Sequence, residues 1–141
     1  MENNEAARGI ALDPAGNIYI AGVSSSPDLP TLSAYQPNFA GLTAAAGTFT
    51  GDGFVAKFSP AGKLLYLTYL GGSRDDGIAA ITVDAAGNAY VTGGTNSPDF
   101  PVVHAFQQVF GGLNGGNQFT GDAFVAKLSP NSPWIKFSQT S

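Results

Sequence analysis

The sequence predicts an all-β protein that consists of two copies of one unit of about seventy residues. Residues 49–60 read FTGDGFVAKFSP and residues 119–130 read FTGDAFVAKLSP, so ten of the twelve positions are identical. Residues 9–30 return in the same way as residues 80–101. The chain also holds 19 Gly and 9 Pro in 141 residues, a turn-rich composition. A long internal repeat with many turn residues is typical of β architectures in which equivalent units stack against each other.

Four short runs of β type follow each other in each unit. In the first unit they cover residues 9–13, 17–22, 53–59 and 64–70, and in the second they cover residues 80–84, 88–93, 123–129 and 134–138. Asp-Pro-Ala-Gly-Asn joins the first two runs, and Ser-Pro-Ala-Gly-Lys joins the last two. Both linkers have tight-turn chemistry, because Pro fixes φ and Gly accepts positive φ. We therefore expect two hairpins in each unit.

Apolar residues stand on both sides of several runs, as in Phe54-Val55-Ala56 and in residues 64–67. A strand with only one buried face would alternate between apolar and polar residues, so we expect these strands to be covered on both faces. Four antiparallel strands stacked face to face with the next unit form the blade of a β-propeller. Helix is expected only as single turns at residues 34–40 and 105–110.

The predicted fold is thus two four-stranded antiparallel β-propeller blades. Blade 1 covers residues 1–77, with a long insert at residues 24–52 between its second and third strands. Blade 2 covers residues 78–141, with the corresponding insert at residues 95–122.

Several motifs in register resemble the bacterial β-propeller repeat family known as SBBP. The first copy carries DPAGNIYIAG (13–22), SPDLP (26–30), DGFVAKFSP (52–60) and LTYLGGSRDDG (67–77). The second copy carries the first three at residues 84–93, 97–101 and 122–130. The resemblance implies a propeller fold and an extracellular or cell-surface setting, but it implies no signature active site. The final strand, PWIKFSQTS, departs from the L-x-Y-L-G-G pattern of its counterpart.

Charge and composition exclude several classes of partner. The net charge is −4, and the six Lys and Arg residues are scattered, which argues against nucleic acid. No apolar stretch has the length of a membrane helix, so membrane insertion is not expected. The chain has no Cys, which excludes disulfides and thiolate metal sites. Residues 1–5 are polar, so no signal peptide is expected at this end.

Two blades cannot close a propeller ring, so the question is what supplies the others. Three copies of the chain would give six blades and four copies would give eight, and we favour the trimer over the tetramer. Further blades of a longer parent chain are the alternative. The sequence shows no Ser/His/Asp spacing, metal cluster or phosphate loop. We therefore expect a non-enzymatic scaffold or binding module with a glycan or protein ligand, and a surface-layer or filament subunit is the alternative.

The site is expected on the rim that carries the long inserts. In a blade the inserts and the links between blades share one rim, and binding residues concentrate in long loops on rigid scaffolds. The speculative ligand-binding residues there are Arg74, Asp75, Asp76, Asp28, Asp99, Tyr35 and His104.

Each candidate also has a structural interpretation, which the sequence favours. Asp75 and Asp76 could bind Ca²⁺ or a polar ligand, or cap a turn. Asp28 and Asp99 suit Asx-type turns. Tyr35 belongs to an aromatic set that could form a sugar-stacking shelf or a small core under the insert. Its other members are Phe39, Phe49, Phe106, Phe110 and Phe119. His104 is the only histidine and lies in a loop. No cofactor is expected, with Ca²⁺ as the single candidate.

The repeated carboxyls outside this list are also expected to be structural. Asp13 and Asp84 stand in hairpin turns. Asp52 and Asp122 precede the third strand of each blade, where each is expected to accept hydrogen bonds.

Overall fold

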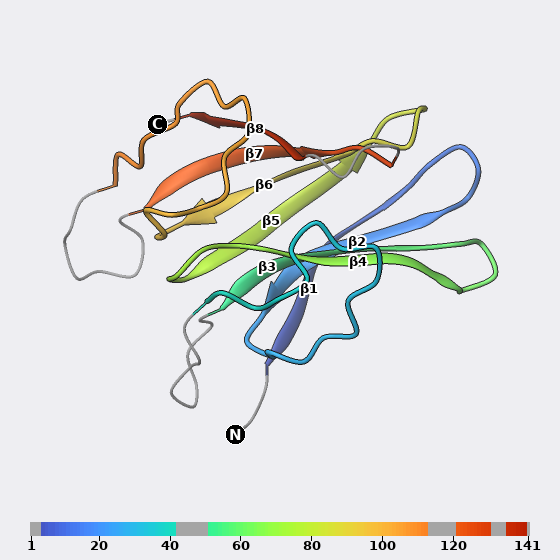
Figure 1. The fold of residues 1–141 in the computed structure, drawn as a ribbon. Coiled ribbons are helices and arrows are strands. Elements are labelled where there is room, and N and C mark those ends of the chain that lie inside the picture. The colour runs from blue at the N-terminus through green and yellow to red at the C-terminus, as the bar shows by residue number, and fades with distance from the viewer. Residues whose placement is uncertain (1–3, 42–50, 113–120, 131–134, 141) are drawn as a thin grey trace.

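The chain folds into two four-stranded antiparallel sheets that stack face to face (Figure 1). The computed structural model describes residues 4–41, 51–112, 121–130 and 135–140, the last of these by backbone alone. The first sheet has the order β1-β2-β3-β4 and the second β5-β6-β7-β8. The strands are β1 (Glu5–Leu12), β2 (Ile18–Ser24), β3 (Asp52–Phe58), β4 (Leu64–Leu70), β5 (Asp76–Val83), β6 (Ala89–Thr95), β7 (Asp122–Leu128) and β8 (Ile135–Thr140). The predicted all-β pair of blade-like sheets is confirmed.

The hairpin turns of both blades are built in the same way. Asp13 Oδ1 accepts hydrogen bonds from the backbone N–H groups of Ala15 and Asn17, both at 3.0 Å. Its Oδ2 accepts from Asn17 Nδ2 at 2.7 Å and from the Tyr19 hydroxyl at 3.1 Å. Gly16 supplies the positive φ of 80° that the turn requires. The predicted turn role of Asp13 is therefore confirmed.

Asp84 repeats this network in blade 2. Its carboxylate accepts from the backbone of Ala86 and Asn88, from Asn88 Nδ2 at 2.7 Å and from the Tyr90 hydroxyl at 3.1 Å. Hydrogen bonds from the paired Asn side chain and backbone lower the pKa of both Asp13 and Asp84. The D-x-x-G-N-x-Y motif is thus a self-contained hairpin device.

The first strand of each blade begins earlier than the sequence predicted. A β-bulge shifts the register between Ala7 and Gly9 in β1 and between Ile78 and Ala80 in β5. Opposite the first bulge, a Cβ on Gly22 would lie 1.9 Å from the Ala6 carbonyl oxygen, and Gly93 approaches the equivalent Gly77 just as closely. Since a bulge breaks the period-two pattern, the runs predicted from residues 9 and 80 start too late. The second sheet therefore begins at Asp76, before the predicted blade boundary.

The short helical turns predicted at residues 34–40 and 105–110 are wrong. The first insert instead runs along the free edge of β4, with isolated bridges from Leu32 to Leu67 and from Gln36 to Tyr69. Pro37 cannot donate a backbone hydrogen bond, and Ser33 has φ of 45°. Residues 105–110 contain no helix either, and His104, the repeat counterpart of Ser33, has φ of 52°.

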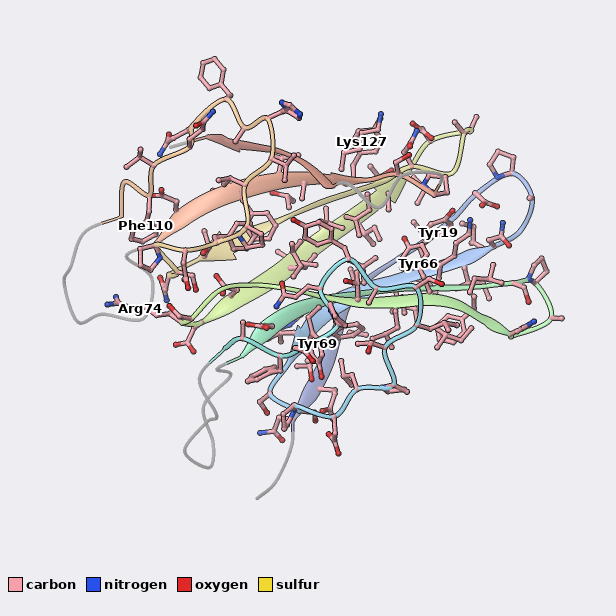
Figure 2. All side chains as sticks on the ribbon, in the orientation of Figure 1. Tyr19, Tyr66, Tyr69, Arg74, Phe110 and Lys127 are labelled. Carbon is pink, nitrogen blue, oxygen red and sulfur yellow. The ribbon has the colours of Figure 1, made fainter. Side chains whose placement is uncertain are left out.

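The core lies between the two sheets. Tyr19, Ala21 and Val55 face it from the first sheet, and the second sheet contributes Ile78, Ala89, Val91, Phe124, Ala126 and Leu128. Tyr66 packs against this core with its ring 6.4 Å from that of Tyr19 (Figure 2). In β3 and β4 the residues on both sides of the pleat are buried, since Val55 and Ala56 are 0% and 2% exposed and residues 67–70 are all buried. Blade 2 covers one face of these strands and the first insert packs on the other, so the predicted two-sided burial is confirmed for β3 and β4.

Candidate functional site

The long inserts and the link between the blades meet at one rim, as the sequence predicted. The Ser73 backbone N–H and hydroxyl of the link donate to Asp99 Oδ1 of the second insert, at 2.9 and 2.8 Å. On the other side, the Gly71 N–H donates to Gln36 Oε1 of the first insert at 3.0 Å. The link is therefore held between the insert of blade 1 and the insert of blade 2.

Asp52, at the start of β3, anchors the base of the first insert. Its side chain is fully buried. Asp52 Oδ2 accepts from the Ala40 N–H at 2.8 Å and from Gln36 Nε2 at 3.1 Å. Asp122 does the same in blade 2, because its Oδ2 accepts from the Gly111 N–H at 2.7 Å and from Gln107 Nε2 at 3.4 Å. The predicted structural role of both carboxyls is confirmed.

Asp76, at the start of β5, ties the link to blade 2. Its Oδ2 accepts from the Gly72 N–H and from the Ser97 hydroxyl, both at 2.7 Å. The Thr95 side chain donates to the same carboxyl. These contacts match the turn-capping interpretation of Asp76.

Burial at this junction raises the pKa of three neighbouring carboxyls. Desolvation by burial raises the pKa of Asp52 to about 7, and the nearby Asp76 charge adds to the effect. Desolvation also raises the pKa of Asp76 to about 6, with a contribution from Asp75. Burial raises the pKa of Asp75 as well, against a hydrogen bond from the Gly51 backbone. The electrostatics of the rim therefore centre on the junction between the blades.

A shallow groove of about 470 Å³ lies where the first insert meets blade 2. Tyr35 and Phe39 line one side, Asp99 and Pro101 line the other, and the link glycines lie between them. The Phe39 ring packs edge-on against Tyr69 at 5.7 Å, which supports the interpretation of the aromatic set as a small core under the insert. Phe49 and Phe119 of that set lie outside the described residues. The groove brings together the predicted candidates Tyr35 and Asp99.

The other predicted candidates are dispersed. Arg74 is exposed and extends from the edge of the molecule, while its backbone N–H donates to Ser97 Oγ at 2.8 Å (Figure 2). Asp28, the repeat counterpart of Asp99, is exposed. Residue 2 is the counterpart of Ser73, which donates to Asp99, and it lies outside the described residues. His104 is exposed on the second insert. The Ser73 backbone N–H lowers the pKa of Asp99, so that carboxyl is ionised at neutral pH.

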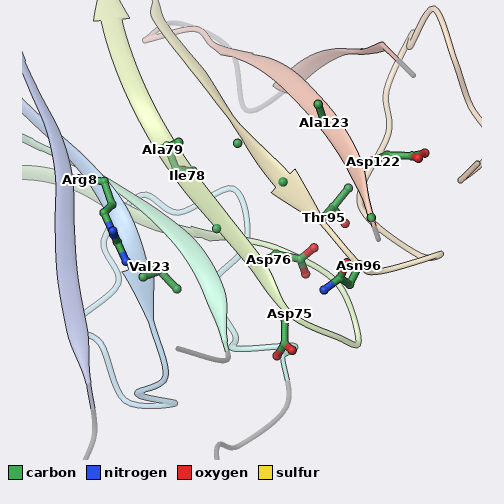
Figure 3. Close-up of a pocket in the computed structure, with 14 residues that line it drawn as sticks. Arg8, Val23, Asp75, Asp76, Ile78, Ala79, Thr95, Asn96, Asp122 and Ala123 are labelled. Carbon is green, nitrogen blue, oxygen red and sulfur yellow. The ribbon is translucent and has the colours of Figure 1, made fainter. Parts of the chain in front are cut away.

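A larger cavity of about 530 Å³ straddles β5 at the same rim (Figure 3). Arg8 and Val23 of blade 1 line it on one side of β5, and Thr95 and Asp122 line it on the other. Small residues form its wall on the second sheet, namely Gly77, Ala79, Gly93, Gly94, Gly121 and Ala123. The cavity opens onto the side of blade 2 that no strand of the described chain covers.

Within the described residues, no three His, Cys, Asp or Glu side chains are grouped so that they could hold a metal ion. The same part of the chain contains no helix long and apolar enough to cross a membrane. Asp75 and Asp76 are therefore not part of such a group.

The sequence placed residues 71–77 on this rim, but sequence reasoning missed the contacts that Gln36 and Ser97 make with them. The sequence did contain a signal for Gln36, because Gln107 stands at the matching position of the second insert. Each Gln precedes the Asp that begins the third strand of its blade. Glu5 was also missed, although it takes the place of Asp76 in blade 1 and accepts a hydrogen bond from the Ser26 hydroxyl.

The comparisons with known proteins agree with this architecture. A family model described as the beta-propeller repeat, SBBP, matches residues 6–30 and 65–101. The two segments hold β1, β2, β4, β5 and β6 and therefore come from both blades. No curated protein matches the chain. The sequence motifs, the two blade-like sheets and the family model agree that residues 6–30 and 65–101 are similar to beta-propeller repeats of the SBBP type.

Proposed function

We propose that this repeat module joins head to tail with further copies of itself to complete a β-propeller, which presents the insert-bearing rim to a glycan or protein ligand. The observation that carries the proposal is the mismatch in burial between equivalent residues. Tyr19, Ala21 and Val55 of blade 1 are completely buried against blade 2. Of their counterparts, Thr92 and Val125 are exposed and Tyr90 is half-buried.

The opposite face of blade 1 has the complementary mismatch. Ile10 and Leu12 are 69% and 64% exposed. Their counterparts in blade 2, Ile81 and Val83, pack against the core between the sheets. Exposed aliphatic side chains grouped on one sheet face mark a surface that needs a partner.

One local contact differs between the two interfaces. Ile81 packs on Gly9, where an added Cβ would lie 3.0 Å from Ile81 Cγ2. Ala80, the counterpart of Gly9, is exposed and carries that Cβ. Ile10 of a second copy would therefore pack on Ala80 a few tenths of an ångström farther from the sheet than Ile81 packs on Gly9. Since the two surfaces differ, the contact is heterologous and generates a ring or a filament rather than an isologous dimer.

The cavity beside β5 supports the same arrangement. Its lining residues Thr95 and Asp122 are the counterparts of Ser24 and Asp52, which lie at the junction with β5 in the first sheet. In an assembled ring, β1 of the next copy would occupy this space. We therefore favour the cavity as the position of the next strand, and the groove at Tyr35 and Asp99 as the ligand surface.

Light scattering on the purified chain tests the assembly. A mass of three copies is expected, with four as the next alternative. Ile10→Asp blocks one face and Val125→Asp blocks the other, so each variant alone should lose the closed ring. An equimolar mixture still contains one intact pair of faces, and it should form a two-copy complex.

Other results would support other functions. Polymers of increasing mass would favour the structural subunit of a surface layer or filament. A monomer that both substitutions leave unchanged would favour blades supplied by a longer parent chain. A glycan array probed with the wild-type chain and with Tyr35→Ala tests the ligand, because loss of a signal in that variant would place the glycan in the groove.

The proposed module is non-enzymatic and extracellular or surface-located. The carboxyls at the rim accept hydrogen bonds from the chain itself, which supports a binding role over acid–base catalysis. The family resemblance supports the location. Fractionation of the source cells with an antibody to this chain tests the location directly.

A further inference from the structure

The junction between the blades contains two buried carboxyls, and in each of them only one of the two oxygen atoms accepts a hydrogen bond. Asp52 and Asp76 are 0% and 4% exposed. Asp52 Oδ2 accepts from Gln36 and Ala40, and Asp76 Oδ2 accepts from Gly72 and Ser97. Within the described part of the chain, the Oδ1 atoms of both residues are buried without a partner, as is Asp75 Oδ1 beside them. An ionised carboxylate oxygen buried without a donor destabilises the folded state.

The two carboxyls are neighbours. An added Cβ on Gly71 would lie 2.3 Å from Asp52 Oδ1 and 2.9 Å from Asp76 Oδ2, so both groups crowd the same glycine. Asp52 fixes the base of the first insert, and Asp76 fixes the link. Repulsion between them therefore acts on the contact between the blades.

The surroundings favour a proton over a metal ion as the group that relieves this repulsion. The other titratable groups nearby are Asp75, which acts on Asp76, and Tyr69 of β4, a phenol that is neutral at pH 7. Arg8 lines the cavity beside Asp75 and Asp76. Within the described residues, Asp52, Asp75 and Asp76 are not grouped so that they could hold a metal ion, and the Oδ1 atoms of Asp52 and Asp76 are closed to solvent.

We propose that Asp52 and Asp76 form an acid-stabilised contact between the two blades, which is tight when the pair holds a proton and loosens when both carboxyls are ionised. The folded state then binds more protons than the unfolded chain. The free energy of unfolding is therefore highest at a pH near the ordinary pKa of Asp. It falls as the pH rises from there through the raised pKa values of about 6 and about 7. The inserts and the link move apart at the rim when the contact loosens. This inference does not depend on the proposed assembly.

Thermal melting of the full chain at pH 5 and pH 8 tests the contact. The wild-type melting temperature should be lower at pH 8 by about 5 °C. Asp52→Asn places a neutral amide where the protonated carboxyl would be. It should therefore raise the melting temperature at pH 8 and remove at least half of the pH dependence. Asp99→Asn is the matched control, because that ionised carboxylate lies at the same rim and should leave the pH dependence unchanged.

Carbon-detected NMR titration of the side-chain carboxyls gives a readout that does not depend on variants. The Asp52 and Asp76 signals should titrate with midpoints above about 5.5, and the Asp99 signal with a midpoint below the ordinary Asp value. Midpoints near 4 for both residues of the pair would overturn the proposal, as would a pH dependence that Asp52→Asn retains. Stabilisation by millimolar CaCl₂ at pH 8 that Asp52→Asn abolishes would also overturn it, since a cation would then occupy the pair.

Discussion

Blade 1 and blade 2 have nearly the same local structure but differ in what surrounds them. The hairpin turns at Asp13 and Asp84, the bulges and the strand registers repeat almost atom for atom. Val55 is nevertheless 0% exposed and its counterpart Val125 is 38% exposed. The comparison shows that features within a blade follow from its sequence, whereas burial follows from the neighbouring sheet.

The two inserts also differ in how they contact their blades, because the last strand of each blade carries a different residue at one position. In blade 1 the Tyr69 hydroxyl donates to the Ser26 carbonyl at 2.7 Å and accepts from the Leu29 N–H at 2.9 Å. Gln139 occupies the equivalent position in blade 2. Phe106, on the second insert, is 90% exposed, whereas its counterpart Tyr35 is half-buried. The first insert is thus fastened to its blade by Tyr69, and the sequence of blade 2 has Gln in place of this tyrosine.

The largest effect should come from a charge placed at equivalent positions of the two faces. Val55→Asp buries a carboxylate between the sheets without a partner and should lower the free energy of unfolding by more than about 4 kcal/mol. Val125→Asp should lower the stability of the isolated chain by less than about 1 kcal/mol, because its side chain reaches water. Urea unfolding measures both. Equal losses would show that the outer face of blade 2 is already covered.

A smaller but equal effect is expected inside the blades. Gly22→Ala and Gly93→Ala each place a Cβ 1.9 Å from a backbone carbonyl oxygen at the bulge. Each should cost about 3 kcal/mol, because the bulged strand must move. The same unfolding measurement checks this. A clear inequality would mean that the neighbouring sheet, and not the blade alone, determines the bulge geometry.

The smallest effect concerns the aliphatic side chains that face opposite sides. Ile81→Ala should destabilise the chain by about 2 kcal/mol, since Ile81 packs against the core. Ile10→Ala should change the stability of the monomer by less than about 0.5 kcal/mol, since Ile10 is mostly in water. Chemical denaturation at low protein concentration separates the two values. A large loss for Ile10→Ala that grows with protein concentration would instead report assembly.

Much of the fold was predictable because its signals are local. The D-x-x-G-N-x-Y motif contains every group that its turn needs, so the hairpins and the role of Asp13 and Asp84 could be inferred from the sequence. The rim was predictable from strand order alone. The helical turns predicted in the inserts were wrong, because pairing of residues 32 and 36 with β4 is a contact between distant segments.

The candidate site was predictable only in outline. Asp75, Asp76, Asp99 and Tyr35 do lie at the junction or in its groove. His104 and Arg74 are exposed and line neither cavity, although the Arg74 charge acts on Asp99. Nothing in the sequence near Asp52 indicates that it lies beside Asp76, because the two approach each other across the link and the insert.

The sequence by itself determined the repeat, the strands and the turns, since each depends on residues that are neighbours in the chain. Only the tertiary structure decided which copy of each repeated residue is buried and which carboxyls have a raised pKa. The physical reason is that burial and pKa depend on what lies across the interface. Two repeated blades in a row must differ in burial wherever a face of one blade packs against the other and the equivalent face of the second blade does not.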